Sequence, residues 1–196
     1  WWHSTRTPWI IRWPGVVKPA RHDRQHMVSG IDLAPTVLDA VGLAPLPDVD
    51  GHSFVPALRG TLQPEFNHVI TQINRTAGKR EFPMRSILDK RFGYIFNAWS
   101  NGKTVFRNES QNGLTMRAMR QAAKTNPKIA SRVKLFLYRT PEELYDYQRD
   151  PDARHNLVND PRYHEVLVEL RTRMLDHMKA TGDVHAVDLK RQLGKD

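Results

Sequence analysis

The chain has 196 residues, 39% of them hydrophobic and 26% charged, with a net charge of +9 and no cysteine. This composition is that of a globular protein, with enough residues for one domain of ordinary size and parts of a second. The missing cysteine excludes disulfides, cysteine–zinc sites and thiol nucleophiles within these residues. No run of about 18 apolar residues predicts a transmembrane helix. No basic segment followed by an apolar one opens the chain as a signal peptide would.

The positive charge indicates an anionic partner, such as nucleic acid, a sulfated sugar or a membrane surface. The basic residues are spread along the chain, and no zinc-finger, RNP or helix-turn-helix pattern accompanies them. We therefore expect a small or polymeric anion as the partner, and neither nucleic acid nor a membrane. A basic surface that only aids solubility is the alternative.

Residues 1–62 carry the pattern of the end of an α/β domain. The apolar run WIIRW at 9–13 predicts a strand that is buried on both faces, as in a parallel sheet. Residues 32–41 predict a helix that Asp32 caps and Gly42 ends. Four apolar residues form a stripe along this helix: Leu33, Val37, Leu38 and Val41.

Residues 63–183 carry the pattern of a small α+β domain with an antiparallel sheet and a C-terminal helix. Alternating or β-rich runs predict strands over 68–73, 85–88, 92–99 and 143–147. Cap and stop signals predict helices over 114–124, 127–137 and from Pro161 to Gly182. The last helix places five residues on one face: Tyr163, Leu167, Leu170, Met174 and Met178. Residues 184–196 are expected to form a polar, mobile tail.

The stretch PEELYDYQRDPDARHNLVNDP at 141–161 combines four aspartates with His155. Oxygen-rich clusters of this kind bind calcium or magnesium in many enzymes. A calcium loop, however, places its oxygens at alternate positions and uses a glycine for its sharp turn, and this stretch contains no glycine. Asp150 precedes a proline as turn aspartates do, and Asp160 can cap the last helix. The stretch therefore predicts structural scaffold, and no metal ligand is assigned in this chain.

Three other patterns match catalytic motifs only in part. His22 and His26 lie four residues apart in a basic segment without a carboxylate pattern, which favours a solvated loop. Ser53 lacks the G-x-S-x-G context of a hydrolase nucleophile, so a helix-capping hydroxyl is favoured. The segment GKTVF at 102–106 lacks the earlier glycine and the following helix of a phosphate-binding loop.

Five longer segments carry a family resemblance. They are TPWIIRWPGVVKPA (7–20), SGIDLAPTVLDAVGL (29–43), DGHSFVPALRG (50–60), FPMRSILDKRFGYIFNAW (82–99) and PEELYDYQRDPDARHNLVNDPRY (141–163). In this order they resemble the C-terminal third of type I sulfatases, in the alkaline phosphatase superfamily. Three elements look most similar to the heparan N-sulfatase, or sulfamidase, branch: the MRS element at 84–86, the helical insertion at 114–137 and the final strand.

The resemblance implies a hydrolase that removes O- or N-linked sulfate from a sulfated sugar. Such enzymes use a formylglycine nucleophile and a calcium ion, which the family places in its N-terminal two-thirds. The chain has no C/S-x-P-S-R motif and starts on Trp1 without an initiator Met, so we expect a C-terminal fragment without catalytic residues or metal ligands. Its expected partners are the sulfated sugar and the N-terminal part of the same enzyme, with a homo-oligomer as a further option. Family members are often exported, periplasmic or lysosomal, but this chain carries no address.

The resemblance places two groups of residues near the substrate. His3, Ser4 and Arg6 lie where the family's chain leaves its catalytic lysine and enters a strand. This location suits a contact to the substrate, and His3 and Arg6 are taken as candidate substrate-binding residues. For Arg6, a structural ion pair is the alternative.

The second group lies in the loop NRTAGKREFPMR at 74–85, which in sulfamidase-like enzymes approaches the mouth of the pocket. Arg75, Lys79 and Arg80 are candidate substrate-binding residues, because guanidinium and ammonium groups suit sulfate. Arg85 precedes an apolar strand and is expected to form a structural ion pair instead. A solvated loop without a binding role is the alternative.

Two other functions stay open. One is a phosphonate or phosphodiester hydrolase of the same superfamily, which only the missing nucleophile motif would separate from a sulfatase. The other is a stand-alone binding module for sulfated polysaccharide.

Overall fold

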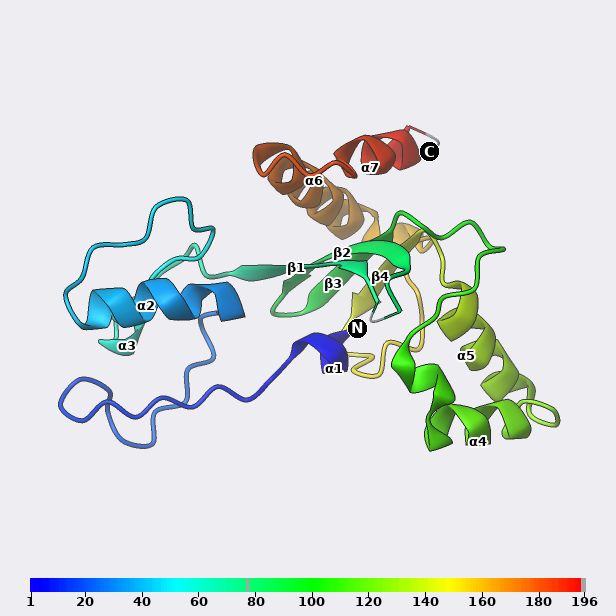
Figure 1. Ribbon diagram of the computed structural model, residues 1–196, viewed down its shortest axis with the longest axis horizontal. Coiled ribbons are helices and arrows are strands. Elements are labelled where there is room, and N and C mark those ends of the chain that lie inside the picture. The colour runs from blue at the N-terminus through cyan, green and yellow to red at the C-terminus, as the bar shows by residue number, and fades with distance from the viewer. Residues whose placement is uncertain (77, 195–196) are drawn as a thin grey trace. The chain divides into compact units, whose positions relative to one another are not determined.

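The computed structural model describes residues 1–76 and 78–194, except for the side chains of Trp2 and His3 (Figure 1). The chain divides into two compact units, residues 1–69 with 88–91 and residues 70–87 with 92–196. The helices of the first unit are α1 (Trp2–Thr5), the 3-10 helix η1 (Gly30–Asp32), α2 (Leu33–Ala40) and α3 (Val55–Leu58). None of the described helices is both long and apolar enough to cross a membrane.

A small aromatic core holds the first unit together. Phe54 lies edge-on to Trp9 and to Phe66, with ring centroids 5.8 Å and 6.5 Å apart. Asp32 orders the chain around this core, because its carboxylate accepts hydrogen bonds from the backbone N–H of Ser29 (2.7 Å) and of His52 (3.0 Å). The aspartate that was expected as a helix cap therefore joins the start of α2 to the loop before α3.

Residues 9–13 do not form the predicted buried strand. Ile10 is 92% exposed, whereas Trp9 packs against the aromatic core. A strand is stable only when its backbone N–H and C=O groups are paired with a neighbouring strand. None of the described residues before His68 forms such a strand, so the apolar run has no neighbouring strand to pair with.

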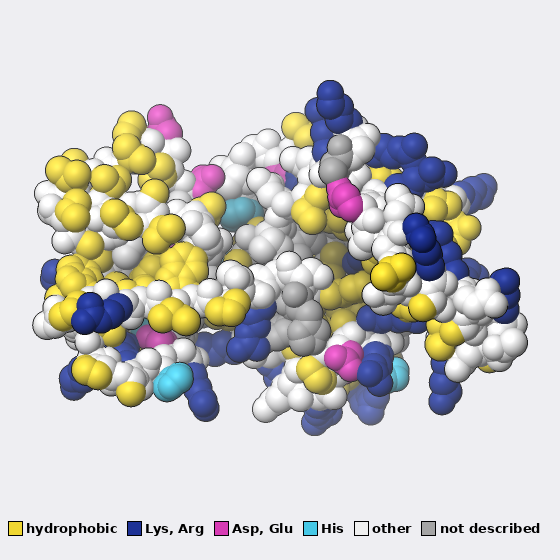
Figure 2. All heavy atoms as spheres, turned by 60° about the horizontal axis from the view of Figure 1, so that its bottom comes forward, with side chains coloured by type: hydrophobic (Ala, Val, Ile, Leu, Met, Phe, Trp, Pro, Cys, Tyr) yellow, Lys and Arg dark blue, Asp and Glu magenta, His cyan; other side chains and the backbone are white. Residues whose placement is uncertain are grey.

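Helix α2 matches its prediction in sequence position but not in burial. It spans Leu33–Ala40, and Gly42 follows it with φ +73°. Its apolar stripe is largely solvent-exposed at Leu33, Val37 and Val41. Figure 2 shows hydrophobic side chains gathered on this part of the molecule. Apolar faces of this kind are usually interfaces.

The second unit is built on a four-stranded sheet with the order β1-β2-β3-β4. The strands are β1 (His68–Arg75), β2 (Glu81–Asp89), β3 (Phe92–Asn97) and β4 (Glu142–Asp146). β3 and β4 are antiparallel, with Tyr94 opposite Leu144. The sheet confirms the strands that the alternating pattern predicts.

The helices of the second unit are η2 (Glu109–Asn112), α4 (Leu114–Ala122), α5 (Pro127–Tyr138), η3 (Pro161–Tyr163), α6 (His164–Ala180) and α7 (Ala186–Leu193). The predicted caps are present: the Asn126 side chain accepts from the backbone N–H of Lys128 and Ile129, and Asp160 accepts from that of Arg162. The predicted face of α6 is the core face. Four of its residues are buried against the sheet: Leu167, Leu170, Met174 and Met178.

Two carboxylates of β4 are buried with their partners. Glu142 accepts a hydrogen bond of 2.6 Å from Tyr94 and a bidentate pair of 2.8 and 2.9 Å from Arg171. Burial and the neighbouring Glu142 charge raise the pKa of Tyr94 well above its usual value. The donors to Glu143 are Arg139 Nε, Tyr145 Oη and Asn97 Nδ2, at 2.7 to 2.8 Å. These pairs tie the sheet to α5 and α6.

Residues 184–196 differ from the expected polar tail. They contain α7, whose Leu189 is fully buried in the same core as Met174 and Met178. Gln192 on α7 also donates to Glu142 at 3.3 Å. A few apolar residues in a largely polar segment give little signal in sequence, but here Leu189 fills a core position, with Ala186 and Leu193 packed beside it.

Candidate functional site

The candidate loop is the turn between β1 and β2, of which residues 76 and 78–80 are described. Lys79 N–H donates to the Thr76 carbonyl at 2.9 Å, and Thr76 N–H donates to the Arg80 carbonyl at 3.1 Å. Lys79 has φ +56°, in the left-handed region that a tight turn needs. The turn therefore projects Lys79 and Arg80 into solvent at one end of the sheet.

Arg75 lies at the base of this turn and pairs with Glu81 across the hairpin. Its Nη2 and Nε atoms lie 2.8 Å and 3.2 Å from Glu81 Oε1. The two side chains are 66% and 70% exposed, so the pair is worth at most about 1 kcal/mol. Arg75 therefore reaches solvent and is able to exchange its partner for an external anion.

Arg85 behaves differently from the three cations of the turn. It forms a buried bidentate ion pair with Asp183, and its Nη1 also donates to the Met84 carbonyl at 3.0 Å. Burial alone would raise the pKa of Asp183, but hydrogen bonds from Arg85 and from the backbone of His185 lower it. The expected structural ion pair of Arg85 is confirmed, and it joins β2 to the end of α6.

The other two candidates belong to the first unit. His3 lies in α1, and its side chain is outside the described residues. Arg6 follows α1 and is exposed. The turn cations belong to the second unit, so the two groups are separate candidates, and a role in substrate binding stays a prediction for both.

Comparison with known proteins supports the family. Residues 1–75 match the family described as N-sulphoglucosamine sulphohydrolase, C-terminal. An ulvan-active sulfatase of Formosa agariphila is 32% identical over 181 residues, which are 91% of this chain and 34% of that protein. Human N-sulphoglucosamine sulphohydrolase is 26% identical over 93% of this chain and 38% of its own length. These matches support a C-terminal sulfatase part, because the chain aligns with sulfatases over 91% and 93% of its length.

Solved structures confirm the fold class of this chain. A structure in complex with its substrate, D-glucosamine-2-N,6-O-disulfate, aligns with a TM-score of 0.59 and 18% identity over 89% of this chain and 28% of that one. A phosphonate monoester hydrolase from Silicibacter pomeroyi aligns with a TM-score of 0.55 and 21% identity over 86% and 28%. At these identities the likeness shows the fold alone. The chain spans about a third of the length of its curated relatives, at 34% and 38%.

Hydrogen bonds give a structural role to three of the four aspartates in the acidic stretch at 141–161. Asp146 accepts from the backbone N–H of Gln148, and Asp150 accepts from that of Arg154 and His155 at 2.6 and 2.7 Å. Asp160 caps η3. Among residues 1–76 and 78–194, no group of three or more histidine, aspartate or glutamate side chains is arranged to hold a metal ion. The chain also lacks cysteine and the C/S-x-P-S-R motif. Its residues therefore do not fit either the calcium or the formylglycine of the family.

His26 was expected in a solvated loop, but its side chain is largely buried. Its Nδ1 lies 2.9 Å from Asp23 Oδ2, and its Nε2 accepts from the backbone N–H of Gln63 at 3.0 Å. The ring also contacts Phe66 edge-on. His26 thus links the basic segment at 21–26 to the aromatic core of the first unit. Its spacing to His22 in the sequence could not indicate this role.

The Asp23–His26 pair predicts a pH-dependent contribution to stability. Burial raises the pKa of Asp23, but hydrogen bonds from His26 and from the backbone of His26 and Gln25 lower it from 3.8 to about 2. A group with a lowered pKa stabilises the fold above its ordinary pKa and loses this contribution as the pH falls through the lowered value. We expect Asp23→Asn to be less stable than the parent in urea unfolding above pH 4, with the gap narrowing towards pH 2. A gap that is constant over this range would contradict the assignment.

Proposed function

We propose that the complete protein that carries this chain hydrolyses sulfate from a sulfated sugar, as an O-sulfate ester or as a sulfamate. The observation that carries the proposal is the 32% identity to an ulvan-active sulfatase along 91% of the chain. A second relative is named for its action on N-sulphoglucosamine, which supports a sugar as the carrier of the sulfate.

This chain would contribute binding groups and not the nucleophile. A formylglycine and a calcium ion would be supplied by the part of the protein outside these residues. The exposed apolar stripe of α2 is the face on which that N-terminal part would pack. On this proposal, Arg75, Lys79 and Arg80 help to hold the anionic substrate, and His3 and Arg6 are the candidates of the first unit.

The rival function is phosphonate or phosphodiester hydrolysis, because a phosphonate monoester hydrolase has a similar fold. The decisive experiment compares the release of sulfate from a sulfated disaccharide with the hydrolysis of a phosphonate monoester by the complete protein. We expect the sulfated sugar to be the better substrate by kcat/KM. A preference for the phosphonate would replace the proposed function by its rival.

The role of the turn is tested by substitution in the complete protein. We expect Arg75→Ala and Arg80→Ala each to raise KM for a sulfated disaccharide about tenfold, because each removes about 1.4 kcal/mol of charged hydrogen bonding. The melting temperature should change little, since both side chains are exposed. Arg154→Ala is the matched control, because Arg154 is an exposed arginine paired with Asp152 on the loop after β4. An unchanged KM in both turn variants would leave the turn as a solvated face.

A further inference from the structure

The segment from 110 to 141 is unbalanced in charge. Basic residues are spread along the whole chain, but acidic residues are absent from these positions. The segment contains seven cations: Arg117, Arg120, Lys124, Lys128, Arg132, Lys134 and Arg139. Because no carboxylate offsets them locally, this segment contributes most of the net charge of +9.

Two of the seven cations have structural roles. Arg132 donates to the backbone carbonyls of Ala153 and Asp152, at 2.7 Å and 3.1 Å, and so ties α5 to the loop after β4. Arg139 pairs with the buried Glu143 at 2.7 Å. Neither guanidinium is free to hold an external anion, and their removal would perturb the fold.

The other five cations are exposed, and within the described part of the chain none of them has an ion pair or a hydrogen-bond partner for its side chain. They are Arg117, Arg120, Lys124, Lys128 and Lys134. On the loop after β4 and at η3, by contrast, exposed cations are paired, Arg154 with Asp152 and Arg162 with Asp160. Five exposed cations without such a partner therefore lie together on α4, α5 and the turn between them.

The two helices that carry these cations pack on each other and on the rest of the second unit. Arg117 and Arg120 are three residues apart on α4 and so project from the same side of the helix. α4 packs against α5. Phe106, just before η2, contacts Phe82 of β2 at 4.9 Å and so joins the pair to the sheet. Its ring stacks on Trp99 at 5.5 Å and contacts Phe136 of α5 at 6.1 Å. The helices that carry the cations are therefore packed against the sheet.

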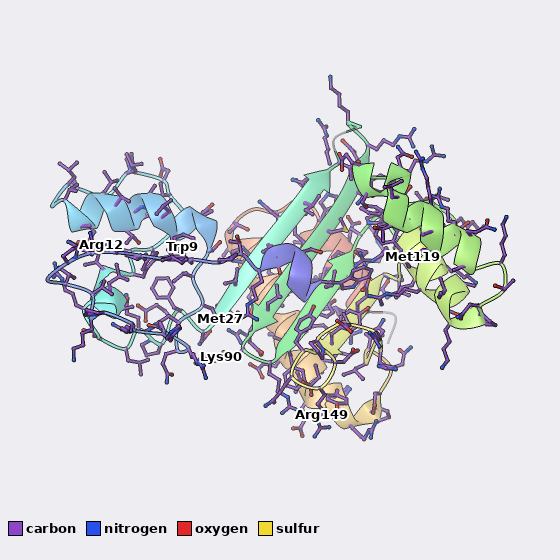
Figure 3. All side chains as sticks on the ribbon, turned by 90° about the horizontal axis from the view of Figure 1, so that it is seen from below. Trp9, Arg12, Met27, Lys90, Met119 and Arg149 are labelled. Atoms are coloured by element: carbon purple, nitrogen blue, oxygen red, sulfur yellow. The ribbon has the colours of Figure 1, made fainter. Side chains whose placement is uncertain are left out.

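The charge continues beyond the helices. Figure 2 shows lysine and arginine side chains gathered over the α4–α5 side of the molecule. Figures 1 and 3, which view the unit from two directions, both place the β1–β2 turn next to the segment that leads into α4, the helix labelled by Met119. Lys79 and Arg80 of that turn are exposed as well. A long anion is able to run from the turn onto the helices, whereas a single sulfate would need only one end of this surface.

We propose that α4 and α5 form a binding surface for a sulfated polysaccharide chain, separate from the turn that would hold the reacting sugar. The inference rests on the proposed function for its choice of anion. A polymer with many sulfates matches a row of unpaired cations by charge, and guanidinium groups bind sulfate oxygens well. The surface would hold the polymer while its end is hydrolysed, and a disaccharide would not need it.

The test compares two variants of the complete protein that lose the same charge. The first carries Arg117→Ala, Arg120→Ala, Lys124→Ala and Lys128→Ala, and alanine keeps the helices because it is the best helix former. The control carries Arg154→Ala, Arg162→Ala, Arg173→Ala and Lys179→Ala, four cations that each have a carboxylate partner. Circular dichroism and thermal melts establish that both variants are folded.

The probe is heparin, with chemically desulfated heparin as the reference. We expect the first variant to lose about tenfold or more in heparin affinity at 0.15 M salt, and to show a weaker dependence of affinity on salt, since fewer counterions are released. The control should stay within about twofold of the parent, because its cations are already neutralised by their partners. Equal losses in both variants, or no loss in either, would overturn the proposal.

Two further measurements separate the possible failures. If duplex DNA or phosphatidylserine vesicles bind as tightly as heparin and lose as much in the first variant, the surface is not one for sulfated sugar. Sulfate release from a disaccharide tests the proposed function alone. If the complete protein releases no sulfate but still binds heparin through the cations of α4 and α5, the proposed function is contradicted and this inference is not. A KM for sulfated polymer that rises in the first variant, with the KM for disaccharide unchanged, supports both.

Discussion

Arg85→Ala is expected to destabilise the complete protein by about 3–5 kcal/mol, the usual cost of leaving a buried charge without its partner. The Arg85 and Asp183 side chains are only 5% and 8% exposed, so water cannot replace the lost guanidinium. The substitution also removes the donor to the Met84 carbonyl. Thermal or urea unfolding measures the loss directly.

The hairpin supplies a matched control for this result. Arg75→Ala removes the same side chain from an ion pair that is 66% and 70% exposed, and should cost at most about 1 kcal/mol. The double variant Arg85→Ala/Asp183→Ala should recover part of the loss, because no charge is then left buried alone. Equal stability of the Arg85 and Arg75 single variants would show that burial does not set the strength of the Arg85 pair.

The different outcomes for the two arginines show what the sequence could predict about the candidate site. Both lie in one basic segment, but only Arg85 is followed by the apolar run that predicts a buried strand. That context was enough to predict a structural pair for Arg85. The partner, Asp183, lies 98 positions away along the chain, and local pattern carries no signal for such a contact.

Local signals predicted the second unit well. Alternating strands, the Asn126 and Asp160 caps and the apolar face of α6 all agree with the structure. Each of these features depends on neighbours within a few residues or on one continuous face. The pairing of β3 with β4 joins residues about 50 positions apart, and no local pattern predicts it.

The first unit departs from its sequence pattern for a physical reason. WIIRW at 9–13 and the stripe of α2 both have the composition of core elements, and both expose apolar side chains. An apolar pattern predicts that a face is to be covered, but it does not say which segment covers it. The exposed faces agree with the proposal that another part of the protein packs there.

α7 and the α4–α5 surface were missed for opposite reasons. In α7 the buried Leu189 packs on the core with the partly buried Ala186 and Leu193, but the segment is otherwise largely polar, so its composition hides this packing. On α4 and α5 the cations are evident in the sequence, but basic residues occur along the whole chain, so their presence alone does not indicate a local surface. The informative signal was the absence of acidic residues from 110 to 141.

Gly51→Ala is expected to destabilise the first unit by about 1–3 kcal/mol or more, the range found when atoms are added to a packed region. A Cβ at Gly51 would overlap the Ile31 carbonyl oxygen and lie 2.6 Å from the Ile31 carbonyl carbon. These atoms belong to the backbone of η1 and cannot rotate away as a side chain would. Separation of the two segments would also break the hydrogen bond from His52 N–H to Asp32.

Gly30→Ala is the matched control, because it adds the same methyl group to η1 itself. A Cβ at Gly30 would have no heavy atom within 4 Å, so its effect should stay within about 0.5 kcal/mol of the parent. Both variants are compared by thermal unfolding of the complete protein, with tryptophan fluorescence as a probe of the Trp9–Phe54 contact. Equal melting temperatures for Gly51→Ala and Gly30→Ala would show that the loop before α3 does not contact η1 closely. The hydrogen bonds of Asp32 would then not be what holds this loop against η1.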